Sequence, residues 1–151
     1  MKNHLRKLSV ITASAMIFSC LGSSMSYAEY ISGETGRTHE YTSDITEDSS
    51  NGLMLYTTKQ DTVSVTGNVT GGQTSGGTDD DSYYAGLSFL TSNQNTVSIT
   101  GNVTATDGDG IYLSIESDKN TIDIGGNVSS TTEGIEVFSS DENKITVGGN
   151  V

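Results

Sequence analysis

The same short phrase closes four consecutive stretches of this chain. Each copy ends in Gly-Asn-Val and follows a run in which apolar and polar residues alternate; the copies occupy residues 66–69, 100–103, 125–128 and 148–151. Counted from Gly to Gly, they lie 34, 25 and 23 residues apart. A repeat of this length indicates stacked structural units. We therefore expect residues 51–151 to form a parallel β-solenoid in which each repeat is one coil.

Each repeat contains two segments with the pattern of a half-buried strand. The first follows a Gly and has two apolar positions, and the second alternates β-branched with small or polar residues. Alternation with period two places the β-branched side chains on one buried face. The second strands predict two inward columns: Val63, Val97, Ile122 and Ile145, and then Val65, Ile99, Ile124 and Val147. Four coils would rise only about 19 Å at a strand spacing of about 4.8 Å.

The Gly-Asn-Val phrase predicts a corner that leads into a third strand. Gly permits a sharp turn, and Asn tolerates left-handed backbone angles. We expect the four Asn side chains to stack as a structural turn ladder, coil over coil. The ladder residues are Asn68, Asn102, Asn127 and Asn150. Three of them also begin N-glycosylation triplets, but the ladder is the preferred interpretation because those triplets follow from the repeat itself.

Two further columns follow from the same alignment. The valines of the phrase should point inward, and a polar column should mark the opposite corner of each coil. The apolar column is Val69, Val103, Val128 and Val151, and the polar column is Asp61, Asn95, Asn120 and Asn143.

Residues 1–28 have the composition of a signal peptide. Three basic residues precede a short apolar stretch, residues 8–21, and Ser26 and Ala28 are small residues where a signal peptidase reads them. We therefore expect a helical signal peptide cleaved after Ala28, and export of the remaining chain. The single cysteine, Cys20, lies in this leader as an apolar residue or, alternatively, as a lipid-attachment site. Cleavage after Ala28 leaves no cysteine for a disulfide.

Charge restricts the partners of the exported chain. The whole chain has 7 basic and 19 acidic residues. Removing residues 1–28 removes 3 of the basic residues and no acid, which leaves 4 basic against 19 acidic residues and a net charge of −15. Such a chain is repelled by nucleic acid and by anionic membrane surfaces. We interpret most of the scattered acids as solvated side chains that keep repetitive strands from associating.

The repeat units resemble the passenger region of bacterial autotransporter adhesins, within the broader family of right-handed β-helix surface proteins. The resemblance rests on units of the form N-x-[IV]-x-[IV]-x-G-N-V separated by G-[ILV]-x-[ILFV], after an export leader. It covers residues 51–151 and implies an all-β, right-handed parallel β-helix of about four coils. It also implies export and outer-membrane translocation machinery as partners, display at the cell surface in association with the outer membrane, and a receptor or glycan of a host or neighbouring cell as the ligand.

The two ends of the array carry separate expectations. Residues 29–50 are polar and lack the repeat, so we expect them to cap the first coil. His39 lies in this segment without partners in the sequence, which predicts an exposed loop histidine. At the other end the chain stops on Val151, at the close of a repeat phrase and without the segments of a translocator barrel. The sequence is therefore expected to be a fragment of a longer passenger.

The insertion at residues 70–84 is the candidate binding loop. Insertions in solenoids emerge on one face, which is often the face that binds. The paired Tyr83 and Tyr84 beside an acidic run suit a carbohydrate or a cation; the alternative is a soluble loop without a site. The candidate metal ligands are Asp79, Asp80 and Asp81 in the insertion and Asp107 and Asp109 in a Gly/Asp turn. At most they imply a weakly bound calcium ion, because other ligands of a calcium loop are missing, and no cofactor is expected.

The exported chain offers no catalytic constellation. A single histidine and no cysteine cannot build a Ser-His-Asp or Cys-His arrangement. Lys59 and Lys119 align with each other, but neither has the acidic calcium cluster on adjacent coils that polysaccharide lyase chemistry requires. We therefore expect a non-catalytic, adhesin-like passenger that displays binding loops.

Two alternatives from other classes remain open. One is a fragment of a carbohydrate-active, pectin-lyase-like β-helix enzyme whose catalytic coils lie beyond Val151. The other is a structural or ice-binding solenoid, which requires regularly spaced threonines. Thr62, Thr96 and Thr121 begin such a row, and Lys144 interrupts it.

Overall fold

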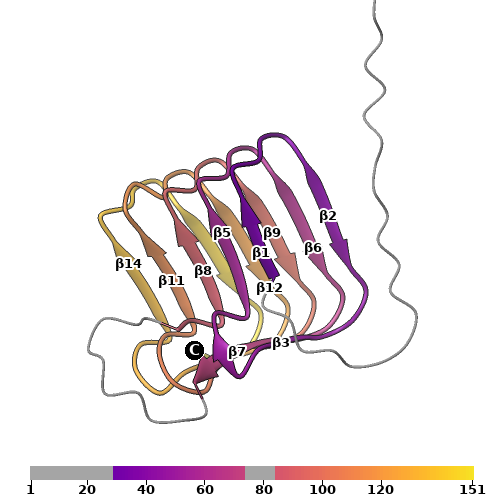
Figure 1. Cartoon of the computed structure of the whole chain (residues 1–151). Helices are drawn as coiled ribbons and strands as arrows, with labels where there is room; N and C mark the ends of the chain where they lie inside the picture. Colours follow the sequence, from indigo (N-terminus) through magenta and orange to yellow (C-terminus); the bar gives the residue numbers. More distant parts are fainter. Residues whose placement is uncertain (1–28, 74–83) are drawn as a thin grey trace, which may run out of the picture.

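The structure is a computed structural model that describes residues 29–73 and 84–151. The expected helical signal peptide and most of the insertion, with Asp79, Asp80, Asp81 and Tyr83, lie outside the described residues. Within the described ranges the chain is an all-β parallel solenoid, as the repeat predicted (Figure 1). Four complete coils and part of a fifth stack in sequence order.

Each complete coil contributes one strand to each of three sheets around a common core. The first sheet contains β1 (Glu29–Ser32), β5 (Leu53–Tyr56), β8 (Leu87–Leu90), β11 (Ile111–Ser114) and β14 (Ile135–Phe138). The second contains β2 (Thr38–Tyr41), β6 (Thr62–Val65), β9 (Thr96–Ile99), β12 (Thr121–Ile124) and β15 (Lys144–Val147). The third contains β3 (Ile45–Thr46), β7 (Val69–Gln73), β10 (Val103–Ala105) and β13 (Val128–Ser129), and the short β4 (Ser49–Ser50) pairs antiparallel with β7.

The register of the strands confirms the predicted inward columns. Val63 pairs with Val97, and the column continues through Ile122 to Ile145. The second column and the Val column of the third sheet are aligned in the same way, from Val65 to Val147 and from Val69 to Val128. The side chains of the middle coils in these columns are almost fully buried. Stacking of neighbouring coils therefore supplies the cover that a single two-strand unit lacks.

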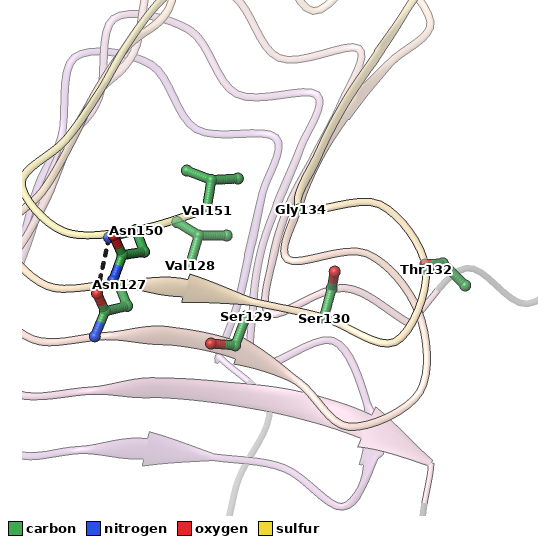
Figure 2. A pocket seen from close by; sticks show the side chains of 8 residues that line it. All are labelled: Asn127, Val128, Ser129, Ser130, Thr132, Gly134, Asn150 and Val151. Carbon is green, nitrogen blue, oxygen red and sulfur yellow. Dashed lines mark hydrogen bonds between the residues drawn. The ribbon is translucent and has the colours of Figure 1, made fainter.

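Two ladders of side-chain hydrogen bonds fix the corners. At the exposed corner, Asn102 donates its backbone N–H to Asn68 Oδ1 at 2.9 Å, and the same contact recurs from Asn127 to Asn102 and from Asn150 to Asn127 at 2.8 Å. Figure 2 shows the last of these bonds, with Val151 stacked over Val128 beside it. The side chains of Asn68, Asn102 and Asn127 thus satisfy backbone N–H groups at the turns of the next coil.

The second ladder lies at the buried corner between the first and second sheets. Asp61 donates its backbone N–H to Asn95 Oδ1, and Asn95 and Asn120 donate in the same way to the next coil, each at 2.9 Å. The donors here point toward later coils, whereas those of the exposed ladder point toward earlier ones. Next to it, Thr58 and Ser92 donate backbone N–H groups to the hydroxyl oxygens of Ser92 and Ser117 at 3.2 Å.

The Gly that precedes each ladder Asn is required by close approach. A Cβ atom built on Gly101 would lie 2.5 Å from Asn68 Oδ1, closer than real Cβ contacts allow. The amide oxygen of one coil therefore occupies the space that a side chain would take in the next. The repeated Gly-Asn pair is a packing requirement of the ladder, as well as a turn signal.

Residues 29–46 form a complete first coil, which differs from the expected segment without a repeat. β1, β2 and β3 pair in parallel register with β5, β6 and β7 at an offset of 24 residues. Positions of this coil that align with core residues of the next carry polar groups: Glu29 aligns with Leu53, and Tyr41 with Val65. The Tyr41 hydroxyl donates to Glu29 Oε2 at 3.2 Å.

His39 is not the exposed loop residue that the sequence indicated. It lies in β2, in register with Val63 of the inward column, and its side chain is only 21% exposed. The sequence did not reveal this coil, because polar residues stand at positions that are apolar in the later coils. In addition, Gly33 and Gly36, with φ of 65° and 66°, take the turn positions where the next coil has Thr57 and Gln60 at 53° and 58°.

The unequal repeat spacing has local causes. β7 continues through residues 70–73, so these residues belong to the third sheet and not to the inserted loop as expected. The interval of 25 contains one extra residue in the turn after β11, where Ile115 is 53% exposed. In the next coil β13 is one residue shorter than β10, so the strands of the first sheet return to register.

The two ladders should differ in their contribution to stability. Asn120 is 1% exposed, and its Nδ2 also donates to Ser92 O at 2.7 Å. We expect Asn120→Ala to lower the free energy of unfolding by about 3 kcal/mol, because it leaves two buried polar groups without partners. Asn127→Ala at the exposed corner should cost about 1 kcal/mol or less, because water can replace the amide. Urea denaturation followed by circular dichroism measures both, and equal losses would contradict the distinction.

Candidate functional site

The connections from the third sheet to the first vary more in length from coil to coil than the connections at the other two corners. Gln73 ends β7 and Tyr84 precedes β8, so the insertion joins these two sheets. Loops of the next two coils, residues 106–110 and 130–134, occupy the same corner. The backbone of Gly108 packs against the Tyr84 carbonyl, with no room for a Cβ atom between them. The structure therefore places the ends of the predicted binding loop beside the predicted Gly/Asp turn.

Asp109 is the one predicted metal candidate that the described part of the structure builds into a cluster. It is 2% exposed, and one oxygen of each of Asp109, Glu133 and Glu136 lies within 4.8 Å of the other two. Asp109 Oδ1 accepts hydrogen bonds from the Thr132 hydroxyl and, at 3.1 Å, from the Glu133 backbone N–H. Asp109 Oδ2 has no hydrogen-bond partner in the protein. Asp107 is exposed and lies outside this cluster.

The Asp109 and Glu133 carboxylates act electrostatically on Glu136. The pKa of Glu136 is raised above its ordinary value of 4.5, first by partial burial, then by a hydrogen bond with Asp109 and by the negative charges of Asp109 and Glu133. Three clustered oxygen ligands are the chemistry that a hard divalent cation such as Ca²⁺ prefers. With half of the usual six to eight ligands, the arrangement suits weak binding completed by water.

The sequence pointed to Asp109 but missed its two partners. Glu133 stands 24 residues after Asp109, one coil later, directly before the Gly that opens the next first strand. The repeat alignment therefore carried the signal for that pair. Glu136 lies on the outward face of β14, in register with Tyr112, and only the turn geometry brings it to Asp109.

The outer face of the first sheet carries aromatic side chains. Tyr30 is 55% exposed, and its ring stacks on that of Tyr56 with centroids 6.0 Å apart and planes 22° apart. Tyr112 lies on the same face in the outward row that includes Tyr30 and Glu136. Tyrosines on a rigid sheet present large contact area at low conformational cost, which is typical of recognition surfaces.

An open hollow lies along the third sheet at the last coil. Figure 2 shows it between β13 and the end of the chain, where the fifth coil has strands in the first and second sheets only. Its lining residues are Asn127, Val128, Ser129, Ser130, Thr132, Gly134, Asn150 and Val151. It lies beside the last hydrogen bond of the exposed ladder.

Comparison with known proteins does not assign the chain to a family. No protein-family model matches it, and no curated protein or solved structure shows significant similarity. In residues 29–73 and 84–151, the structure contains no helix long and apolar enough to cross a membrane.

The acidic cluster predicts a specific pH dependence. Because the folded chain raises the pKa of Glu136, folding favours its protonated form. The stability from this group is complete below the ordinary pKa of about 4.5 and is lost as pH rises through the higher folded value. We expect Glu136→Gln to raise the melting temperature at pH 7 relative to wild type, and this advantage to shrink toward pH 4. Thermal denaturation across this range measures the difference.

Glu116→Gln is the matched control, because Glu116 is an exposed glutamate at the opposite corner. It should leave the pH dependence close to that of wild type. A Glu136→Gln profile parallel to wild type would show that the three carboxylates do not repel one another in solution.

Proposed function

We propose that this chain is the non-catalytic binding module of an exported, adhesin-like surface protein. The observation that carries the proposal is that a rigid solenoid presents one outward row on its first sheet, with Tyr30 at one end, Tyr112 further along and the acidic cluster of Glu136 at the other end. Binding residues are typically found on loops and exposed aromatics that a rigid scaffold positions. The leader-like residues 1–28 support export, and the autotransporter-like repeat supports display at the cell surface.

The chemistry of the surface narrows the class of ligand. Stacked tyrosines suit the apolar face and the hydroxyl groups of a sugar, and Tyr112 in register with Glu136 suits a hydroxyl group or a cationic group. A net charge of −15 after loss of the leader disfavours acidic glycans, nucleic acid and anionic membranes. The partner proposed here is therefore a neutral glycan or a glycoprotein receptor on a host or neighbouring cell. Export and outer-membrane translocation machinery would be its partners during display.

The tyrosine face provides the direct test. We expect the purified chain to bind neutral glycans on an array of cell-surface glycans more strongly than sialylated ones. The double variant Tyr30→Ala with Tyr56→Ala should weaken that binding at least about tenfold, because it removes stacking worth about 1 kcal/mol or more per ring. Array binding followed by biolayer interferometry on the best glycan gives both results.

The control is a double variant on another face of the same coils. Thr62→Ala with Thr96→Ala changes two exposed, register-paired residues of the second sheet and should leave affinity unchanged. Failure of the wild-type chain to bind any glycan or cell surface would contradict the proposal, as would equal losses in the two double variants.

A second candidate, an ice-binding or purely structural solenoid, is favoured by one observation. The first coil extends the predicted threonine row, because exposed Thr38 pairs in register with Thr62, and the row continues through Thr96 to Thr121. Lys144 ends it on the fifth coil. Thermal hysteresis measured on wild type and on Thr62→Ala with Thr96→Ala decides this candidate: only an ice-binding face would show hysteresis that the double variant loses.

A further inference from the structure

Three residues of the first two coils depart from the repeat, and all three meet at one point. Glu34, His39 and Asp61 each place one ligand atom within 4.8 Å of the other two. From this convergence we propose that they form a binding site for one divalent transition-metal ion of the Zn²⁺ class, which ties the first coil to the second. The ion would act as a staple at the end of the solenoid.

Each of these residues replaces a repeat residue of different chemistry. His39 stands in the column otherwise filled by Val63, Val97, Ile122 and Ile145. Glu34 aligns with Thr58, the first member of the buried hydroxyl ladder. Asp61 precedes Asn95, Asn120 and Asn143 in the buried amide ladder. Closing the first coil does not by itself require these three changes, because the later coils close with the residues of the repeat.

The change from Asn to Asp leaves a buried oxygen without a partner. In later coils the corresponding Nδ2 donates to the hydroxyl-ladder residue of the previous coil: Asn95 to Thr58 Oγ1 at 3.1 Å, and Asn120 to Ser92 O at 2.7 Å. Asp61 has a carboxylate oxygen in place of that donor. It is 1% exposed, its Oδ1 accepts the Arg37 backbone N–H at 2.7 Å, and its Oδ2 has no hydrogen-bond partner. A bound cation would stabilise a buried carboxylate oxygen of this kind.

The imidazole is placed to share that cation. His39 Nε2 is buried and lies 3.0 Å from Glu34 Oε2, but without the geometry of a hydrogen bond. Two carboxylates and one neutral imidazole carry a net charge of −2, which a divalent ion neutralises. Imidazole with carboxylate oxygens suits Zn²⁺ and its first-row neighbours, whereas Ca²⁺ and Mg²⁺ take oxygen ligands.

The geometry requires only a small closure. Ligand atoms in a tetrahedral zinc site lie about 3.3 Å apart at bond lengths of about 2.0 to 2.1 Å. Glu34 has the most exposed of the three side chains, at 42%, and can rotate inward to complete the set. Water would take the fourth position. The ligands come from the turn after β1, from β2 and from the residue before β6, so the ion would join two consecutive coils.

The test uses variants that restore the repeat. His39→Val and Asp61→Asn introduce the residues found at the same positions of other coils, so both are expected to fold. Every protein carries His4→Ala and Cys20→Ser, which removes the other histidine and the single cysteine as zinc ligands. Glu40→Ser is the control beside His39, since the next coil has Ser64 at that position. Asp109→Asn tests the separate acidic cluster.

We expect calorimetric titration with ZnCl₂ to show one ion bound per chain, and saturating Zn²⁺ to raise the melting temperature by about 5 °C. Glu40→Ser and Asp109→Asn should keep both effects, while His39→Val and Asp61→Asn should lose the one-to-one binding. Zn²⁺ should also shift the His39 imidazole resonances in NMR spectra. The proposal is overturned if the wild-type chain binds no Zn²⁺, or if His39→Val or Asp61→Asn binds it as tightly as wild type does.

Discussion

Hydrogen bonds between equivalent turns of successive coils hold this molecule together. A solenoid buries its apolar columns only if every coil starts its strands at the same height, and parallel strands alone allow slippage. Here side chains of the exposed ladder, such as Asn68, and of the buried ladder, such as Asn95, accept backbone N–H groups of adjacent coils at two corners. The donors of the two ladders point in opposite directions along the stack. Each coil is therefore located by its neighbours on both sides, and the columns from Val63 and Val65 follow from that register.

This constraint also explains where function can reside. Residues inside the ladders and columns are fixed by their copies in the next coil, so variation is tolerated at the corner between the third and first sheets and in the end coils. Asp109 and its acidic partners lie at that corner, and the stacked Tyr30 and Tyr56 lie on the first two coils. His39, Glu34 and Asp61 occupy the first coil and its junction with the second. In a repeat protein, a departure from the repeat is a better guide to a site than the presence of a reactive residue type.

The sequence predicted the fold because its repeat encodes contacts between coils. The strand pattern, the inward columns and the all-β parallel stack follow from aligning four copies of one phrase. The sequence did not reveal the first coil, because His39, Tyr41 and Asp44 replace the residues that identify the repeat. Asp44 is nevertheless a member of the exposed ladder, since its Oδ1 accepts the Asn68 N–H at 2.7 Å. The sequence predicted Asp109 but not the whole acidic cluster, because Glu136 comes close to Asp109 only in the folded chain. Asp79, Asp80, Asp81 and Tyr83 stay predictions, as do export and display at the cell surface.

Cysteine cross-linking tests the in-register stack most directly. Thr62 and Thr96 are exposed partners on adjacent strands, whereas Thr121 lies two coils from Thr62, about 9.6 Å away at the usual strand spacing. In a background that carries Cys20→Ser, Thr62→Cys with Thr96→Cys should form an intramolecular disulfide under mild oxidation, because its Cα separation lies within disulfide range. Thr62→Cys with Thr121→Cys should stay reduced. Efficient bonding of the second pair, or none in the first, would contradict the stacked-coil structure.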